Sequence, residues 1–241
     1  MSKIYEALEH ANKAKGKGSD LPIPVSMALK EDELVLREEM LGLYKMIEAL
    51  LPDMKSRVIQ FISTREGEGT STIVREFSKL AADHIGHNVL LLEADRCRPG
   101  QKDHFKIPSQ YSWIDALKRG EDIGGAVHHV PESNLHVSFA CNDAGSTPEF
   151  FNSPVFDTFC NVLRSEFDLV LIDSAPFSVS PDGLAIASKV DGIVLVIEAE
   201  RTKWQAVKLV KDSFNRVGGN ILGSVLNKRR YYIPEYIYKF L

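Results

Sequence analysis

The chain has 241 residues, a formal net charge of −4 and 44% hydrophobic residues, which suit one α/β domain with extensions or two small domains. The mild negative charge gives no global reason to expect nucleic-acid binding. Cys97, Cys141 and Cys160 are odd in number and widely spaced, so they exclude a disulfide framework and indicate reduced thiols.

Residues 1–30 are expected to form a helix and a linker ahead of the main domain. Ser2 can cap a short helix with Ile4 and Leu8 on its apolar side, and residues 16–25 (GKGSDLPIPV) have the composition of a linker. The start lacks the apolar core of a signal peptide, and no run approaches the roughly 18 apolar residues of a membrane span. We therefore expect a cytoplasmic protein that reaches a membrane only through a partner.

Residues 31–228 show the pattern of an α/β domain. Glu31–Leu50 is an amphipathic helix. Apolar runs then predict strands at 58–62, 89–92, 135–140, 169–172, 193–197 and 221–226, and helical spacing appears at 112–118, 148–164, 183–188 and 203–217. This alternation predicts a doubly wound, mostly parallel sheet with helices on both faces and a ligand at the carboxyl ends of the strands.

The first predicted strand leads into a glycine-rich stretch, STREGEGTST, from Ser63 to Thr72. Strand, glycine-rich turn and helix form the context in which backbone N–H groups cradle phosphates. Against the pattern G-x-x-x-x-G-K-[ST], Gly69 and Ser71 match, whereas Thr64 and Thr70 replace the first glycine and the lysine. From these residues alone, an ordinary strand-to-helix turn remains an alternative.

Two predicted strands end in acidic residues. Glu93 and Asp95 follow VLLL, and Asp173 follows LVLI. Carboxylates that end strands beside a phosphate loop commonly hold Mg²⁺ through bound water. Asp182, in the sequence SPDG, either belongs to a mobile loop after the second of these strands or caps the following helix.

The motifs STREGEGTST, VLLLEADRCRP and FDLVLIDSAP, in this order, resemble those of the bacterial tyrosine kinases (BY-kinases) of capsule and exopolysaccharide biosynthesis. The similarity covers roughly residues 31–227 and the tyrosine-rich tail. The opening SKIYEALEHA also resembles tyrosine kinase homologues of exopolysaccharide operons. The family has a P-loop NTPase fold related to the Min/Par ATPases, so the resemblance implies that fold, with ATP and Mg²⁺ as cofactors.

The resemblance also implies roles for individual residues. The nucleotide-binding residues would be Gly67, Glu68, Gly69, Thr70, Ser71 and Thr72. Mg²⁺ would be held by Ser71, Asp95 and Asp173, and the catalytic residues would be Glu93, Asp95, Asp173 and Arg65. Arg98 and Pro99 match the Arg-Pro that follows the second motif.

Three departures from the family bear on activity and assembly. Thr70 replaces the lysine that draws charge from the phosphates, and Glu93 replaces an aspartate. The E-x-x-R-x-x-R motif of ring-forming members aligns here with Glu38, Leu41 and Tyr44, so ring assembly through that motif is not expected.

Arg65 has two interpretations. It aligns with the extra signature lysine of Min/Par ATPases, which reaches phosphate across a dimer, and an arginine could do so bidentately. Alternatively, it is an exposed arginine paired with Glu66 or Glu68.

The tail, residues 229–241, follows a basic run and carries four tyrosines: Tyr231, Tyr232, Tyr236 and Tyr238. It resembles in kind the autophosphorylated tyrosine cluster of the family. By itself, an aromatic and basic tail is typical of a docking segment or a membrane-surface patch.

We therefore expect a self-associating, ATP-dependent protein-tyrosine kinase of exopolysaccharide biosynthesis that phosphorylates its tail tyrosines in trans. A membrane-bound polysaccharide chain-length (co-polymerase) protein would be its activating partner. A catalytically weakened nucleotide-binding regulator of polysaccharide polymerisation or export is one alternative, and a Min/Par-like positioning ATPase is another.

Overall fold

The computed structural model describes residues 31–52, 55–108, 111–140 and 148–229, with no side chains described for 31–34. The predicted N-terminal helix, Cys141 and the tail tyrosines lie outside the described residues. The chain divides into two units, Met1–Val35 and Leu36–Leu241. Of the first unit only residues 31–35 are described, as helix, whereas the sheet and the candidate site belong to the second unit.

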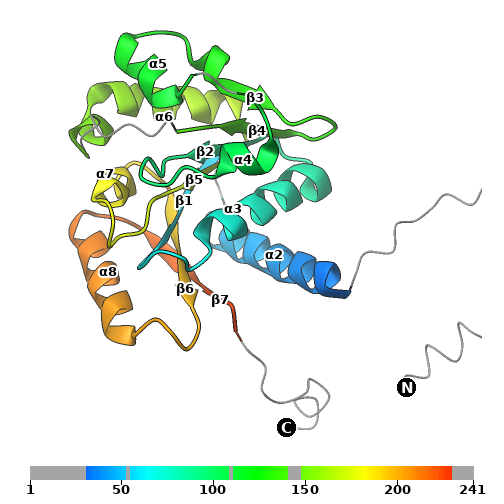
Figure 1. Ribbon diagram of the computed structural model, residues 1–241, viewed down its shortest axis with the longest axis vertical. Coiled ribbons are helices and arrows are strands. Elements are labelled where there is room, and N and C mark those ends of the chain that lie inside the picture. Colours follow the sequence, from blue (N-terminus) through cyan, green and yellow to red (C-terminus); the bar gives the residue numbers. More distant parts are fainter. Residues whose placement is uncertain (1–30, 53–54, 109–110, 141–147, 230–241) are drawn as a thin grey trace, which may run out of the picture. The chain divides into compact units, whose positions relative to one another are not determined.

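A seven-stranded sheet forms the second unit, with the strand order β3-β4-β2-β5-β1-β6-β7 (Figure 1). Its strands are β1 (Arg57–Ser63), β2 (Val89–Glu93), β3 (Val127–His129), β4 (Leu135–Ser138), β5 (Leu169–Asp173), β6 (Gly192–Glu198) and β7 (Ile221–Asn227). Every pair is parallel except β3 with β4. The predicted doubly wound, mostly parallel sheet is confirmed, whereas the short edge strand β3 was not predicted.

Helices connect the strands. They are α2 (Glu31–Leu50), α3 (Thr70–Lys79), η1 (Leu80–Ile85), α4 (Gln101–Phe105), α5 (Trp113–Arg119), η2 (Ile123–Ala126), η3 (Pro148–Asn152), α6 (Pro154–Glu166), α7 (Asp182–Ala187) and α8 (Trp204–Arg216). The helical structure predicted over 148–164 is present, but it is divided between the 3-10 helix η3 and α6. The Ser153 side chain caps α6 and Pro154 opens it, so the chain starts a new helix there. α4 was not predicted.

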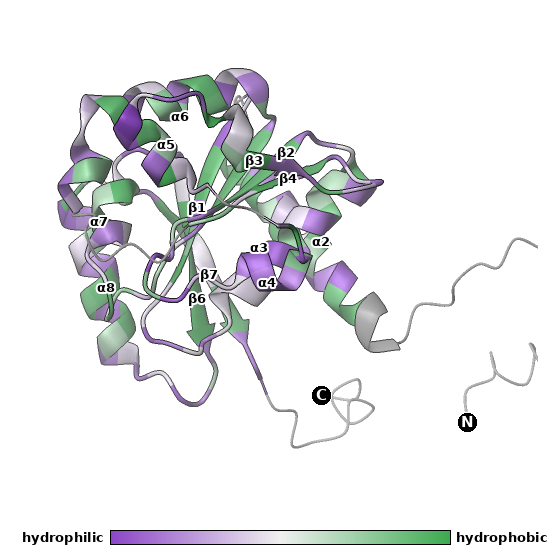
Figure 2. Ribbon diagram, turned by 45° about the horizontal axis from the view of Figure 1, so that its top comes forward, coloured by the Kyte–Doolittle hydropathy of each residue, from purple (hydrophilic) through white to green (hydrophobic). Residues whose placement is uncertain are grey.

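The central strands are buried on both faces, because helices cover each side of the sheet there, whereas the edge strands β3 and β7 are half-buried or exposed. Along β1, Ile59 and Phe61 pack with α2 and α3, whereas Val58 and Ile62 point into the clusters on the other face. All four side chains are fully buried. This two-sided burial explains why the strands are almost uniformly apolar, as Figure 2 shows by their green colour.

Trp113, the first residue of α5, joins the second motif to the helical layer. Its ring is fully buried and stacks on Phe159 with a centroid separation of 5.3 Å. Its indole N–H donates to the backbone oxygen of Glu93 at 2.8 Å. The end of β2 is therefore fixed from this side of the sheet by one aromatic side chain.

We expect Trp113→Ala to lower the free energy of unfolding by about 3–5 kcal/mol, because it leaves a large cavity and an unpaired buried carbonyl. The chain has one other tryptophan, Trp204, which is 67% exposed. Trp204→Ala is the matched control and should change stability by no more than about 0.5 kcal/mol. Urea denaturation followed by circular dichroism measures both variants, and equal destabilisation would contradict the packing described.

Candidate functional site

The glycine-rich loop, residues 64–69, follows β1 and ends where α3 begins. Gly67 and Gly69 have φ angles of 80° and 95°, in the left-handed region that favours glycine. Gly69 precedes the first residue of α3, and a Cβ there would approach Asn227 Nδ2 to 2.2 Å. Asn227 donates from this atom to the Glu68 backbone oxygen at 2.8 Å. Both glycines are therefore required by the conformation of the loop and by its contact with the end of β7.

Glu68 shapes the loop from inside. Its side chain is buried and accepts hydrogen bonds from the backbone N–H groups of Thr64, at 2.8 Å, and Arg65, at 3.1 Å. The hydroxyl groups of Thr64 and Thr202 also donate to it. Both oxygens of the carboxylate thus accept hydrogen bonds from the protein. Glu68 therefore positions the glycine-rich loop, which the sequence predicts to contact the nucleotide.

The two acids after β2 hold the loop that follows them. Asp95 Oδ1 accepts from the N–H groups of Cys97 and Arg98, both at 2.9 Å. Glu93 accepts from Gly100 N at 2.6 Å and Gln101 N at 2.8 Å, with a longer bond of 3.3 Å from Ala140 N. Glu93 therefore caps the start of α4 and ties it to the end of β4.

Glu93 and Asp173 lie side by side, because they are register partners in β2 and β5. Burial raises the pKa of Glu93 to about 7, and the Asp173 charge adds to this against the opposing N–H donors. Burial likewise raises the pKa of Asp173 to about 6, and Asp95 adds to this, whereas hydrogen bonds from Gln101 and Ser71 and the Arg75 charge oppose it. A cation bound here would favour the ionised forms of both groups.

Gln101 and Arg75 were not predicted. The buried Gln101 amide donates to the Ser71 backbone oxygen at 3.0 Å and to Asp173 Oδ2 at 2.7 Å. Its own oxygen accepts from Arg75 Nη1 at 3.3 Å. Gln101 lies outside every predicted element and 72 positions before Asp173, so no sequence pattern indicated this bridge between α3, α4 and β5.

Asp182 is held by Arg96 in a buried ion pair. Arg96 Nε and Nη2 donate to Asp182 Oδ2 at 2.9 and 2.6 Å, and the two side chains are 9% and 2% exposed. Pro181 is the N-cap residue of α7, and the N–H group of Asp182 donates to the Ser180 hydroxyl at 3.2 Å. The interpretation of Asp182 as a helix cap is therefore wrong: its carboxylate links the loop after β2 to the segment after β5.

A cavity of about 210 Å³ lies where the loops after β1, β2 and β5 meet. It is lined by residues 66–72, by Asp95, Cys97 and Arg98, and by Ser174, Pro176 and Val179. Arg98 is the one cationic side chain among the described lining residues, and its Nη1 lies 2.7 Å from Glu66 Oε2. Glu93 and Asp173 lie behind this surface.

Arg65 is exposed and lies on the other side of the loop. It lines a second cavity, of about 440 Å³, together with Glu198, Arg201 and Thr202. Because Glu66 pairs with Arg98 and Glu68 turns inward, the predicted pairing of the Arg65 guanidinium with either carboxylate is wrong for the described part of the chain. Of the predicted site residues, residues 67–72 and Asp95 thus line the first cavity, whereas Arg65 lines the second.

Oxygen atoms suited to Mg²⁺ are present at this edge of the sheet. Asp173 Oδ1 is buried without a hydrogen-bond partner among the described residues, and the Ser71 hydroxyl lies beside the same carboxylate. Across the described ranges, no three His, Cys, Asp or Glu side chains group as a metal site on their own. Mg²⁺ in phosphate-loop proteins retains several waters, so these residues fit that ion without such a cluster.

Comparison with known proteins finds similarity to proteins named tyrosine-protein kinases. It is 27% identical over 175 residues to the tyrosine-protein kinase CpsD of Streptococcus agalactiae, covering 72% of this chain and 76% of the relative. It is 23% identical over 216 residues to the tyrosine-protein kinase YwqD of Bacillus subtilis, covering 90% of both. No family model matches the sequence.

Solved structures show the same fold. The kinase domain of the Escherichia coli tyrosine kinase ETK superposes with a TM-score of 0.75 at 16% identity, covering 95% of this chain and 91% of that one. The septum site-determining protein MinD of Pyrococcus horikoshii, complexed with Mg-ADP, gives 0.63 at 18% identity, covering 77% and 76%. The chain therefore shares the fold of a tyrosine kinase domain and of MinD. In sequence it is a relative of proteins named tyrosine-protein kinases, which confirms the resemblance to the bacterial tyrosine kinases seen in the motifs.

The raised pKa of Glu93 predicts a pH-dependent stability. Because the folded protein holds this proton above the unfolded value of 4.5, the free energy of unfolding should fall as the pH rises from 4.5 to about 7. The contribution of Glu93 is at most about 3 kcal/mol. Glu93→Gln should remove it and flatten the curve, leaving the smaller contribution of Asp173.

Urea denaturation at a series of pH values, without nucleotide or Mg²⁺, measures this difference. Glu66→Gln changes an exposed carboxylate of the same kind and is the matched control. Parallel stability curves for Glu93→Gln and the parent protein would show that Glu93 is ionised throughout.

Proposed function

We propose that the chain is a BY-kinase-like protein that binds Mg-ATP at the cavity between the glycine-rich loop and Asp95. The observation that carries this proposal is the loop itself: two glycines in the left-handed conformation open helix α3 at the carboxyl edge of a parallel sheet. The N–H groups of such a helix start favour an anion, and strand-end carboxylates flank it. The relatives named as tyrosine-protein kinases support the same function.

Mg²⁺ would be held by Ser71 and, through water, by Asp95 and Asp173. When bound, the ion neutralises developing charge on the phosphates. The protein's own contribution is positional: Gln101 fixes the Asp173 carboxylate against the start of α3, and Asp95 orders the loop that carries Arg98.

The proposed reaction transfers the γ-phosphoryl group of ATP to a tail tyrosine of another copy, so the P–O bond to ADP breaks and a P–O bond to the phenol forms. The acceptors would be Tyr231, Tyr232, Tyr236 and Tyr238. A membrane-bound polysaccharide chain-length protein is the proposed partner, and Arg65 on the loop's outer side is the residue available to a second subunit. Thr70 favours a second candidate function, a regulator that binds nucleotide with little turnover.

Incubation with Mg²⁺ and γ-labelled ATP, followed by mass spectrometry of the tail, tests the kinase proposal. We expect phosphotyrosine in the parent protein, and no label in the variant with Tyr→Phe at 231, 232, 236 and 238. Both proteins should bind Mg-ADP equally in calorimetry. Label that persists in the variant would place the acceptors elsewhere, and binding without any label would favour the regulator.

We further infer that Arg98 supplies the positive charge that Thr70 lacks. Arg98 belongs to the lining of the loop cavity, and its guanidinium already reaches across to Glu66 on the glycine-rich loop. Its side chain is 72% exposed, so it can turn from Glu66 to a phosphate at little cost. Arg65 lines the other cavity and lacks this placement.

Arg98→Ala should weaken Mg-ADP binding by about ten- to a hundredfold, as expected for loss of a charged hydrogen bond. Arg65→Ala is the matched control and should change affinity in the monomer less than about twofold. In the Arg98→Ala background, Thr70→Lys should restore affinity, because a lysine at this position meets the phosphates directly.

Calorimetry of the three variants, with turnover measured over a dilution series, shows whether the charge comes from Arg98 of the same chain or from Arg65 of a second subunit. If Arg65→Ala loses activity that rises with protein concentration, the charge comes from a second subunit and the role of Arg98 is refuted. Absence of nucleotide binding by the parent protein would instead refute the phosphate-loop proposal as a whole.

A further inference from the structure

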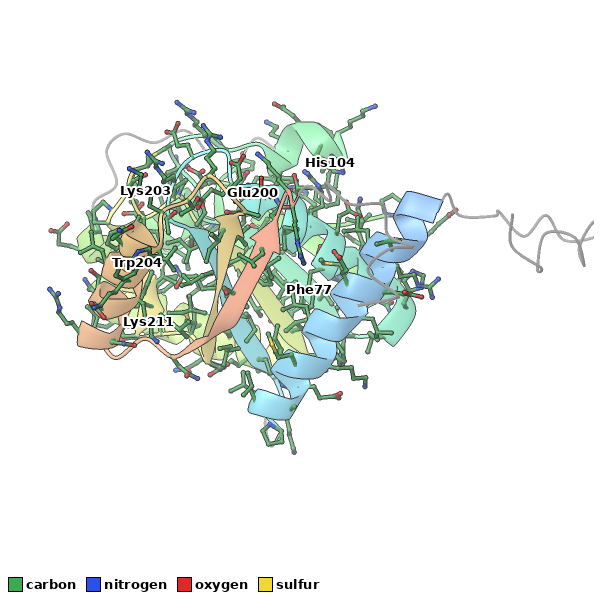
Figure 3. The ribbon with its side chains drawn as sticks, turned by 90° about the horizontal axis from the view of Figure 1, so that it is seen from below. Phe77, His104, Glu200, Lys203, Trp204 and Lys211 are labelled. Atoms are coloured by element: carbon green, nitrogen blue, oxygen red, sulfur yellow. The ribbon has the colours of Figure 1, made fainter. Side chains whose placement is uncertain are left out.

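Helix α8 carries an exposed aromatic and basic stripe. Trp204, Lys208, Lys211 and Asn215 recur at spacings of four, three and four residues, so they share one side of the helix. All four are exposed, Trp204 by 67%, and the Lys208 ammonium lies 6.0 Å from the centre of the Trp204 ring. Trp204 and Lys211 lie along the outer side of α8 in Figure 3, with Lys203 beside its first turn. We call Trp204, Lys208, Lys211 and Asn215 the α8 stripe.

The fold does not require the α8 stripe. The helix is anchored by another side, where Val210 and Phe214 are buried against the sheet with Ile193 and Leu195. An exposed tryptophan contributes nothing to this core, and the nucleotide cavity lies at the loops after other strands. The stripe is therefore available for an interaction that involves neither the core nor the nucleotide cavity.

The charge of this region is opposite to that of the chain. Residues 200–217 contain five Lys and Arg but two Asp and Glu, whereas the whole chain has a formal net charge of −4. Within the described part of the chain, Lys203, Lys208 and Lys211 form no ion pair. Arg201 is paired with Glu198, whereas α8 itself carries three cations (Lys208, Lys211 and Arg216) and one acid (Asp212), so its net charge is positive.

We propose that the α8 stripe docks on the surface of an anionic phospholipid bilayer. Tryptophan prefers the headgroup region, where its ring is buried and its N–H stays hydrated, and lysines attract anionic lipid while their long stems follow the surface. Protein–protein interfaces, by contrast, are depleted in lysine. The combination of one protruding tryptophan with flexible lysines therefore favours lipid over an acidic protein.

The contact is peripheral. No described helix is long and apolar enough to cross a membrane. Val210 and Phe214 of α8 are already used by the core, so the stripe reaches the headgroups through Trp204 and the lysine stems. Leu209, which is 57% exposed, is not part of the stripe. Peripheral binding of this kind is weak and reversible and falls with salt, because the lysine contribution is screened.

The two tryptophans make a direct test possible with the full chain. Trp113 is fully buried, so a change in fluorescence on addition of vesicles reports Trp204. We expect a blue shift and protection from acrylamide quenching with vesicles of phosphatidylcholine and phosphatidylglycerol, and neither with phosphatidylcholine alone. Lys208→Gln with Lys211→Gln should weaken partitioning by about fivefold per lysine.

The matched control is Lys45→Gln with Lys79→Gln, which removes the same charge from α2 and α3, on the other face of the sheet. It should bind vesicles like the parent protein. The proposal is overturned if no blue shift occurs, or if the stripe and control variants lose binding equally. Vesicle sedimentation without a change at Trp204 would assign binding to another segment, and a blue shift with polyglutamate but not with vesicles would indicate an acidic protein; each refutes the lipid surface.

Discussion

The buried carboxylate of Glu93 is the group on which the loops around the cavity depend. Its side chain accepts from Gly100 and Gln101 at the start of α4 and from Ala140 after β4, while its backbone oxygen accepts from Trp113. Aspartate, which the family carries here, is shorter by one methylene. Glutamate at this position therefore acts on the geometry of the site through α4, since its carboxylate lies behind the cavity rather than at its surface.

An ion pair holds the loops after β2 and β5 together. Arg96 and Asp182 form a buried pair in which each group would be costly to bury alone. Gln101 adds a neutral bridge from the start of α3 to Asp173. The site is thus rigid at its base, where charges are paired and buried, and adjustable at its rim, where Arg98 and Glu66 are exposed. The positive charge that the loop lacks at Thr70 is therefore easier to supply from an exposed side chain at the rim than from a buried one at the base.

Periodicity predicted most of the fold because the central strands are buried on both faces and are therefore mostly apolar, and because the helices show one apolar side. It failed where a local cap decided the outcome, as at Ser153, and where an element was too short to have a period, as in β3 and α4. The acids of the site were found because parallel strands end at one edge. Which carboxylates turn inward depends on donors far away in the chain, such as Gln101 for Asp173, and no single-sequence pattern contains that information.

The end of β7 joins the two parts of the chain that the function would require to act together. Asn227 donates to the Glu68 backbone oxygen, and the Lys228 ammonium donates to the Gly67 backbone oxygen while lying 3.6 Å from Glu198. The two residues that precede the tail, Asn227 and Lys228, therefore each donate one hydrogen bond to the glycine-rich loop. A ligand that displaced the Gly67 carbonyl group would break the hydrogen bond from Lys228, and one that displaced the Glu68 carbonyl group would break the bond from Asn227.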